Sequence, residues 1–368
     1  MKVTRLEFSG LRSFEAGRLD PGGGLNLLVG PNGSGKTSVL EALHLMAYGR
    51  SFRGRVRDGL IRNGADALEV FVEWQESSGR TRRAGLRHSG QAWEGRLDGG
   101  PLGQLGDLCA ALAVVSFEPG SHALVMGPAE TRRRFMDWGL FHVEPEFLSL
   151  WRRYGRALKQ RNSLLKMRSR DGQLDAWEQE LGATGAVLTG FREAYLQQLQ
   201  PYVAAASQDL LPEAGGVELR FQPGWRRDEL GLRDALLLAR DRDLATGFTS
   251  VGPHRADWKI AQERIPGREA LSRGQAKLTA LALLLAQAEH QAGVRKDWPV
   301  IALDDLASEL DRGHQRLVLE RLRNDGAQVL VSGTEAPAAL QGLGVPVSMF
   351  HVEPGAIKPE GSPQAEPE

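Results

Sequence analysis

One short stretch restricts the possible folds of this chain of 368 residues more than any other: Gly30-Pro31-Asn32-Gly33-Ser34-Gly35-Lys36-Thr37. It matches G-x-x-x-x-G-K-[ST], a pattern in which a glycine-rich turn joins a buried strand to the N-terminus of a helix. The apolar run at residues 25–29 predicts that strand, and apolar residues at helical spacing after Thr37 predict the helix. The sequence therefore predicts a strand–turn–helix unit within an α/β fold.

This turn has the chemistry of a phosphate-binding loop. Backbone N–H groups at a helix N-terminus point toward one place, where the helix dipole also favours an anion. Lys36 is expected to neutralise the β- and γ-phosphates of a nucleotide, and the Thr37 hydroxyl to hold Mg²⁺. A glycine-rich turn that merely fits the pattern is the alternative, and the correct flanks on both sides argue against it.

Two carboxylates follow a later buried strand. The apolar run at residues 299–303 ends in Asp304 and Asp305. A carboxylate at the end of such a strand holds Mg²⁺ in nucleotide sites of this type, so Asp304 is the predicted metal ligand. Asp305 is expected to orient or deprotonate the attacking water.

A second anion-binding helix end is predicted before the Ala/Leu-rich segment at residues 278–289. The string L-S-x-G-Q there supplies Ser272, Gly274 and Gln275. A serine with a nearby glycine at a helix N-terminus can leave N–H groups directed at a phosphate.

The segment from residue 147 to residue 170 contains no acidic residue. Such a long run of one charge is the footprint of a polyanion-binding surface, and a solvated basic helix is the alternative. Its basic residues are Arg152, Arg153, Arg156, Lys159, Arg161, Lys166, Arg168 and Arg170, and the first six are the predicted contacts with DNA phosphates. Residues 132–134 form a second, weaker basic cluster. The arginine-rich loop at residues 48–57 is either a solvated loop or a phosphate-contacting segment next to the nucleotide site. His254 alone is more typical of a packed histidine, and a nucleotide- or DNA-proximal role stays open for it.

Bulk composition is that of an ordinary water-soluble globular chain. Hydrophobic residues make up 41% and charged residues 25%, and 46 basic side chains balance 46 acidic ones. The single cysteine excludes a disulfide or cysteine cluster within the chain. No apolar run approaches a membrane span, so the expected location is the cytoplasm, with no membrane partner.

The chain is expected to fold as two lobes. Residues 1–117 and 250–353 would form a discontinuous lobe around the phosphate-binding loop, with a buried strand at residues 110–117. Residues 118–249 would form a helical insertion with the basic face, including helices at residues 174–195 and 196–211. Residues 354–368 are rich in Pro and Glu and are expected to be a disordered tail.

The order of these motifs resembles ABC-type ATPases of the SMC class and, more closely, the RecF family of bacterial recombination mediators. The resemblance covers nearly the whole chain and rests on these stretches in addition to the phosphate-binding loop: Leu11-Arg12-Ser13-Phe14, Arg132-Arg133-Arg134-Phe135-Met136-Asp137-Trp138-Gly139, Phe141-His142-Val143-Glu144-Pro145, Lys159-Gln160-Arg161-Asn162, Gly252-Pro253-His254-Arg255-Ala256-Asp257, Leu271-Ser272-Arg273-Gly274-Gln275 and Leu303-Asp304-Asp305 with Ser308-Glu309-Leu310-Asp311. It implies an ABC/SMC-type P-loop ATPase head with an inserted helical lobe.

The resemblance also implies a function. ATP and Mg²⁺ would bind at the P-loop, and Ser272 and Gly274 would reach the γ-phosphate on the partner's P-loop in an ATP-dependent homodimer. The dimer would bind duplex DNA and single-strand/double-strand junctions, and would act with RecR and RecO to load RecA in repair and replication restart.

Three departures from the ABC pattern imply a weak, DNA-stimulated ATPase used as a switch. Asp305 replaces the usual catalytic Glu, and the switch histidine expected after Val331 is missing, with Ser332 or Thr334 in its place. The glutamine expected near residues 115–118 is also not evident. The alternative function is an ABC-type subunit that energises a transporter or another protein machine without binding DNA.

Overall fold

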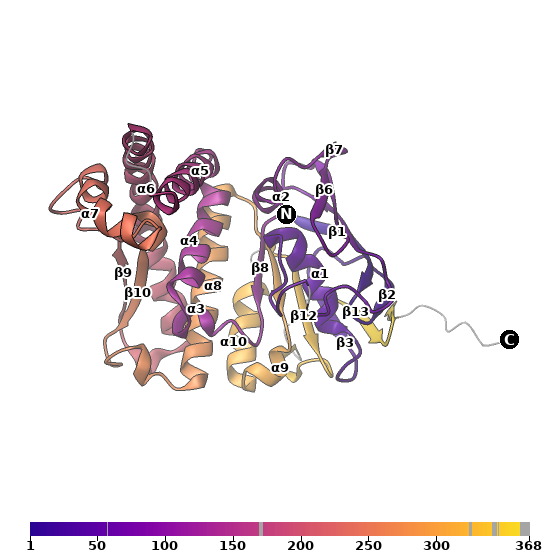
Figure 1. The fold of residues 1–368 in the computed structure, drawn as a ribbon. Helices are drawn as coiled ribbons and strands as arrows, with labels where there is room; N and C mark the ends of the chain where they lie inside the picture. The colour runs from indigo at the N-terminus through magenta and orange to yellow at the C-terminus, as the bar shows by residue number, and fades with distance from the viewer. Residues whose placement is uncertain (57, 169–171, 324–325, 341–343, 345, 361–368) are drawn as a thin grey trace. The chain divides into compact units, whose positions relative to one another are not determined.

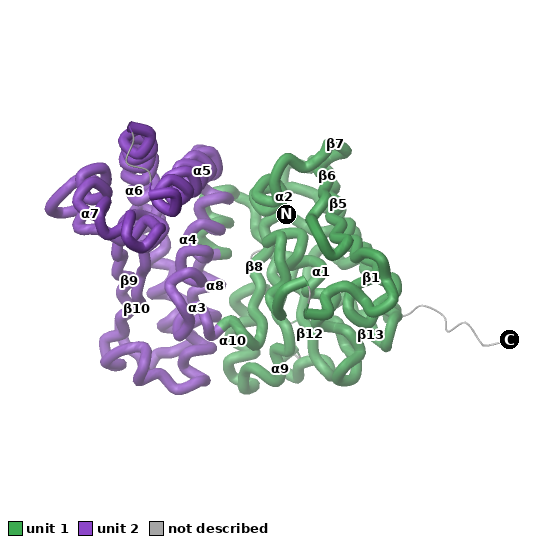
Figure 2. The backbone as a smooth tube through the Cα atoms, in the orientation of Figure 1, with its two compact units in different colours: residues 1–121, 288–368 green, residues 122–287 purple. Residues whose placement is uncertain are grey.

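A computed structural model describes residues 1–56, 58–168, 172–323, 326–340, 344 and 346–360. The chain divides into two compact units, which Figure 2 shows in two colours. The first unit combines residues 1–121 with residues 288–368, and the second comprises residues 122–287. Both ends of the chain therefore build one unit, and the second unit is an insertion.

The first unit contains a sheet whose strands are mostly parallel, in the order β14-β13-β3-β12-β11-β8. Only β14 is antiparallel to its neighbour. The strands are β3 (Leu25–Val29), β8 (Val114–Phe117), β11 (Val300–Leu303), β12 (Val329–Gly333), β13 (Val347–Glu353) and β14 (Ala356–Pro359). Because β3, β11 and β12 run parallel, their carboxyl ends lie at the same edge of the sheet, where ligands bind in α/β folds.

A second sheet in this unit is antiparallel, in the order β2-β1-β4-β5-β6-β7. Alternating buried and exposed residues along β1 and β4 give the sheet one apolar face. Its strands are β1 (Lys2–Leu11), β2 (Phe14–Leu19), β4 (Leu68–Gln75), β5 (Thr81–His88), β6 (Trp93–Leu97) and β7 (Gly100–Pro101).

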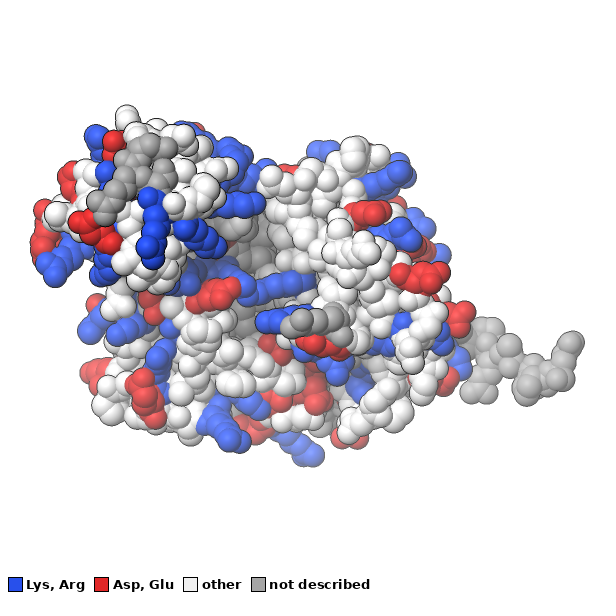
Figure 3. All heavy atoms as spheres, in the orientation of Figure 1, with Lys and Arg blue, Asp and Glu red and all other residues white. Residues whose placement is uncertain are grey.

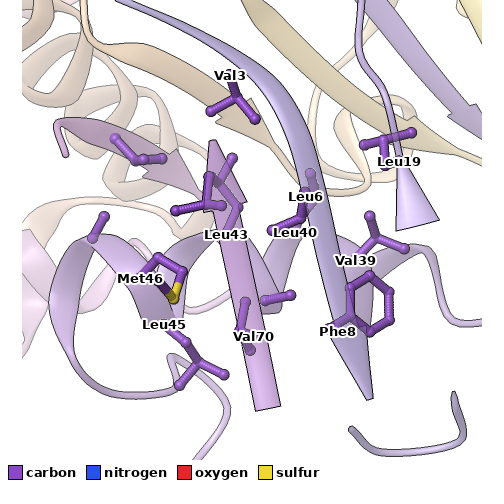
Figure 4. Close-up of a cluster of buried hydrophobic side chains, with 14 of the residues drawn as sticks. Val3, Leu6, Phe8, Leu19, Val39, Leu40, Leu43, Leu45, Met46 and Val70 are labelled. Atoms are coloured by element: carbon purple, nitrogen blue, oxygen red, sulfur yellow. The ribbon is translucent and has the colours of Figure 1, made fainter. Parts of the chain in front are cut away.

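The helix α1 (Lys36–Tyr48) lies between the two sheets, in contact with β1 and β4 on one side and β8 and β12 on the other. It is buried almost all round because both sheets cover it, and Figure 4 shows Leu40, Leu43 and Met46 packed against Leu6 and Val70. The P-loop helix is thus fixed in the core. The other helices of this unit are α2 (Leu105–Ala111), α9 (Leu306–Glu309), α10 (Arg312–Arg323) and the 3₁₀ turn η4 (Ala338–Leu340).

The second unit is mainly helical and carries one antiparallel hairpin of β9 (Val217–Gln222) and β10 (Asp257–Gln262) (Figure 1). Its long helix α6 packs against α4, α5 and α7. The helices are α3 (Ala123–Met126), α4 (Ala129–Val143), α5 (Phe147–Lys166), α6 (Gly172–Leu210), α7 (Leu232–Thr246) and α8 (Arg273–Arg295), with 3₁₀ turns η1 (Pro212–Ala214), η2 (Pro253–Arg255) and η3 (Arg268–Ala270). The last turns of α8 belong to the first unit.

The predicted fold class is confirmed, but several predicted boundaries are wrong. Residues 110–111 end α2, so the strand expected at 110–117 is only β8. The two helices expected over 174–211 are one helix, which continues through Pro201 because its apolar face packs along its length. The predicted lobe boundary also moves, because β10 pairs with β9 and residues 250–287 belong to the second unit.

The prediction of a disordered tail from residue 354 is wrong at its start. Ala356–Pro359 forms β14, which pairs with β13 and extends the parallel sheet. Residues 361–368 lie outside the described part of the chain. Among the described residues, none of the helices combines the length and apolar character needed to cross a bilayer.

Candidate nucleotide-binding site

The P-loop connects β3 to α1, as predicted. Lys36 is almost fully buried, and its Nζ donates hydrogen bonds to the carbonyl oxygens of Gly30 at 2.7 Å and Pro31 at 2.9 Å. Burial lowers the pKa of Lys36, while the charges of Asp305 and Asp304 act in the opposite direction. The ammonium group is therefore held over the loop, where it can exchange neutral carbonyl partners for the oxygens of a phosphate.

Glycine is required at two positions of the loop. Gly33 has φ +82° and Gly35 has φ +107°, backbone conformations that side chains strongly disfavour. A Cβ atom on Gly35 would also lie 2.3 Å from a ring carbon of Phe14, so no other residue fits there. Between them, the Ser34 hydroxyl is buried without a hydrogen-bond partner among the described residues, as expected of a loop whose polar groups await a ligand.

Asp304 lies against the first turn of α1. The Thr37 hydroxyl donates to Asp304 Oδ1 at 3.1 Å, and the Ser332 hydroxyl donates to the same oxygen at 2.6 Å. Burial raises the pKa of Asp304, and these two hydrogen bonds offset the effect only in part. The charge of Asp305 also raises the pKa of Asp304, whereas the charge of Arg53 lowers it.

These oxygen donors fit Mg²⁺. The ion prefers hard oxygen ligands and is usually bound by one or two carboxylates together with substrate phosphates and water. Thr37 and Asp304 would supply the protein's share of such a shell. No group of three or more His, Cys, Asp or Glu side chains suited to a metal occurs in the described ranges, so a fully protein-built cage is not present there.

Ser332 joins the two aspartates. Besides bonding Asp304, its hydroxyl accepts the Asp305 N–H at 2.9 Å. Asp305 itself adopts a left-handed conformation (φ 53°, ψ 41°), and its carboxylate accepts a hydrogen bond from the Ser308 hydroxyl at 2.9 Å. Non-glycine residues held in this conformation cluster at functional sites. The sequence offered Ser332 or Thr334 in place of the switch histidine, but the contacts of Ser332 with both aspartates were not predicted, although a polar residue at the end of an apolar strand is a signal that indicates them.

A second unpredicted contact braces α1 from the other side. Arg12 donates hydrogen bonds of 2.9 Å and 2.7 Å to the two carboxylate oxygens of Glu41, which is fully buried. This pairing raises the pKa of Arg12, chiefly through the hydrogen bond. Arg12 lies in the turn between β1 and β2, and Phe14 begins β2, so this hairpin fixes both the P-loop turn and the helix that follows it.

The L-S-x-G-Q segment lies at the N-terminus of α8, in the second unit. Ser272 N–H donates to Gln275 Oε1 at 3.0 Å, and Gln275 N–H donates to Ser272 Oγ at 3.2 Å. This reciprocal pairing caps the helix. Ser272 and Gly274 are exposed, so the N-terminus of α8 is accessible at the surface of its unit.

The basic residues of α5 fall into different environments. Arg156, Lys159 and Lys166 are exposed and make no ion pair with any residue that the structure describes. Arg153 is exposed but pairs with Glu180 at 3.0 Å, and Arg152 is half-buried. In Figure 3, Lys and Arg atoms gather around the place that α5 takes in Figure 1.

The prediction that Arg161 contacts DNA is wrong. Its side chain is fully buried and bonds Glu178 at 2.9 Å, Asp243 at 2.8 Å and the Thr249 hydroxyl at 2.8 Å. Arg161 lies on the same helical face as buried Tyr154, seven residues earlier, so helical periodicity indicates its burial. The weaker cluster at 132–134 is also used internally, in the contacts Arg132–Asp257, Arg133–Ala256 and Arg134–Glu130.

His254 is a packed histidine. Its Nε2 lies 2.9 Å from the Thr249 carbonyl oxygen, and its Nδ1 lies 2.7 Å from the Tyr154 hydroxyl. Because a carbonyl only accepts, Nε2 carries the proton and Nδ1 accepts from Tyr154. Burial lowers the pKa of His254 to about 4, so the ring is neutral at pH 7.

The fold and these residues define a P-loop nucleotide-binding head of the ABC/SMC type. The family model described as RecF/RecN/SMC N terminal domain matches residues 2–358. The chain belongs to the RecF family. It is 63% identical to the DNA replication and repair protein RecF of Stenotrophomonas maltophilia (strain R551-3), over 97% of this chain and 99% of that protein. It is 37% identical to RecF of Shewanella piezotolerans (strain WP3 / JCM 13877), over 97% of this chain and 99% of that protein.

Solved structures agree on the fold. A RecF–ATP structure from the RecFOR pathway superposes with a TM-score of 0.86, at 23% identity, over 97% of each chain. An Smc head bound to the C-terminal winged-helix domain of ScpA superposes less closely, with a TM-score of 0.58 at 15% identity over 98% of this chain and 97% of that one. The whole chain, insertion included, therefore has the RecF form of this head.

Proposed function

We propose that this chain is an ATP-dependent DNA-binding protein of recombinational repair and replication restart. The observation that carries the proposal is the convergence of Lys36, Thr37 and Asp304 at one edge of the parallel sheet, with Thr37 and Asp304 in direct contact. Two findings support the same assignment. The relatives are named DNA replication and repair protein RecF. The chain also superposes on a RecF–ATP structure.

The P-loop residues 30–37 bind the phosphates of ATP, and Lys36 neutralises their charge. Thr37 and Asp304 hold Mg²⁺, which when bound shields the β- and γ-phosphates. Asp305 orients the attacking water from the strand end. Its side chain is one methylene shorter than the glutamate usual in ABC-type ATPases, which favours slow hydrolysis and a switch rather than a motor.

ATP assembles two copies of the chain. The exposed residues Ser272 and Gly274 of one copy, with half-buried Gln275, complete the site on the P-loop of the other, giving an isologous dimer. The N–H groups at the α8 N-terminus suit a γ-phosphate, and a serine-capped helix end is a general anion site. Hydrolysis removes the shared phosphate and releases the dimer.

DNA binds along the basic face of α5, defined as Arg152, Arg153, Arg156, Lys159 and Lys166. The charges of Arg156, Lys159 and Lys166 are not neutralised by described residues, so they are available to phosphates. The substrates are duplex DNA and single-strand/double-strand junctions at gaps. RecR and RecO act with the bound dimer to load RecA.

The alternative is an ABC-type subunit that energises a protein machine without DNA. The unneutralised basic face favours the DNA-binding function, because a surface that meets only protein has no need of clustered positive charge without counter-charges.

Fluorescence anisotropy with a labelled gapped duplex, at two salt concentrations and with or without ATP, tests the proposal. We expect ATP to strengthen binding, and Lys159→Ala to weaken it at low salt and to flatten the salt dependence. Arg220→Ala is the control, because Arg220 is exposed but paired with Glu218. Binding that is absent at both salt concentrations, with an intact ATPase, would support the alternative instead.

A further inference from the structure

An exposed aromatic ring lies at the C-terminal end of the basic face of α5. The helix α7 ends at Thr246 and is capped by Gly247, and the next residue, Phe248, is 43% exposed. The guanidinium carbon of Arg255, itself exposed, lies 5.3 Å from the centroid of the Phe248 ring. The pair presents a planar, apolar and positively charged surface to solvent.

This pair differs from the other two arginine–aromatic pairs among the described residues. Arg82 lies over Trp74, which is fully buried, and also pairs with Asp98. Arg5 lies over Phe71 and pairs with Glu73. Arg255 makes no ion pair with a described residue and donates one hydrogen bond, of 3.3 Å, to the Thr249 carbonyl. Within the described part of the chain, no acidic side chain neutralises its charge.

The chain on both sides of Phe248 is fixed to α5. A Cβ atom on Gly247 would lie 3.5 Å from Lys166 Cγ, so this glycine packs against the lysine stem. On the other side, the Thr249 N–H and hydroxyl donate to Asn162 Oδ1 at 2.8 Å and 2.7 Å. Lys166 and Lys159 are seven residues apart, about two helical turns, so they share one face of α5.

The buried network below the pair makes it rigid. Arg161 and His254 both bond Thr249, the first through its hydroxyl and the second through its carbonyl oxygen, and Tyr154 holds His254. Every hydrogen-bonding group of Thr249 is thereby used. A preorganised surface loses little entropy when a ligand binds to it.

We propose that Phe248 and Arg255 form a stacking site for an unpaired nucleobase of single-stranded DNA, whose backbone continues along Lys166 and Lys159. The inference rests on the proposed function, because it assigns part of the same DNA-binding surface. Bases of a single strand stack on exposed aromatic rings and on arginine, whereas those of an intact duplex are already stacked on one another. The site would therefore distinguish a gap from continuous duplex.

The test compares two fluorescein-labelled probes in anisotropy titrations of the full chain with ATP: a blunt duplex, and the same duplex with an oligo-dT gap. Phe248→Ala is expected to weaken binding to the gapped probe about tenfold and to leave the blunt duplex unchanged. Phe248→Trp should retain binding to both. Leu238→Ala, at an apolar residue of α7 that is 77% exposed, is the matched control and should change neither probe.

Salt dependence separates stacking from charge. The Phe248→Ala loss on gapped DNA should be equal at low and high salt, whereas Lys166→Ala should reduce the salt slope on both probes. Equal losses on both probes, or no loss on either while the wild type binds, would overturn the stacking site and leave the proposed function standing. Wild-type protein that binds neither probe contradicts the proposed function, and this inference with it.

Discussion

The Thr37 hydroxyl and an Asp304 carboxylate oxygen lie 3.1 Å apart although 267 residues separate them in the chain. Thr37 lies in the first turn of α1, which follows β3, and Asp304 directly follows β11, which lies two positions from β3 in the same sheet. The insertion of a whole helical unit between them does not disturb this contact, because parallel strands bring their carboxyl ends to one edge. This edge is where nucleotide and metal would meet.

Replacing Lys36 should abolish nucleotide binding without unfolding the chain. The Lys36 ammonium group donates hydrogen bonds to two loop carbonyls, so Lys36→Ala should lower the free energy of unfolding little. The same change removes a charge-assisted hydrogen-bond donor to the phosphates of ATP. We expect ATP affinity to fall roughly 100-fold. Isothermal titration calorimetry measures it, with Lys2→Ala, an exposed lysine of the same unit, as the control. If Lys36→Ala bound ATP as tightly as the wild type, the phosphates of ATP would have to bind at another site.

Two arginines of α5 should behave in opposite ways. Arg161→Ala leaves Glu178 and Asp243 as buried carboxylates that have lost their shared cation, and should lower the free energy of unfolding by about 3 kcal/mol. Arg156→Ala, at an exposed position, should stay within about 0.5 kcal/mol of the wild type and weaken DNA binding instead. Urea unfolding followed by circular dichroism distinguishes them. Similar stability in the two variants would contradict the assignment of Arg161 to the core.

These two residues also show what the sequence could and could not predict. A count of charges along residues 147–170 treats Arg156 and Arg161 alike, and only the position on the helix face separates them. The P-loop and Asp304 were predictable because each depends on local order: strand, turn and helix, or strand and acid. The contacts of Ser332 with the aspartates and of Glu41 with Arg12 were missed because they depend on pairing between elements remote in the chain.

The same distinction holds for the fold. Strands β3, β11 and β12 follow from apolar runs with polar ends, which is a local signal. The strand β14 was not predicted, because its short and Pro-flanked sequence has weak strand preference and forms only by pairing with β13. The uninterrupted α6 likewise depends on packing, since Pro201 alone favours a break.

Stability should depend on pH through His254. Burial lowers the pKa of this ring to about 4, below the unfolded value near 6.5, so the unfolded chain binds the extra proton first. The contribution to stability is complete above pH 6.5 and is lost as the pH falls from 6.5 to 4, by roughly 3 kcal/mol. We expect the difference in unfolding free energy between wild type and His254→Gln to shrink over this interval. A constant difference from pH 7 to pH 4 would mean that folding does not lower the pKa of His254.

Ser332 should affect turnover more than binding. Its hydroxyl holds Asp304 and the left-handed Asp305 together, so Ser332→Ala leaves the Asp305 N–H without its partner. We expect ATP turnover to fall about tenfold with little change in KM, since the nucleotide contacts are intact. Ser332→Thr keeps the hydroxyl and should keep most activity. A higher KM with unchanged kcat would indicate that Ser332 binds the nucleotide instead of positioning the aspartates.

The central claim is that ATP joins two copies of this chain, each supplying Ser272 to the P-loop of the other. The most direct test is to measure the mass of the protein by light scattering as it elutes from a sizing column in the presence of MgATP. The account predicts a shift from the 40.2 kDa chain to twice that mass with ATP, and none with ADP. Ser272→Arg should bind ATP and remain at the single-chain mass. Wild-type protein that is saturated with ATP and still elutes as a single chain would contradict the account.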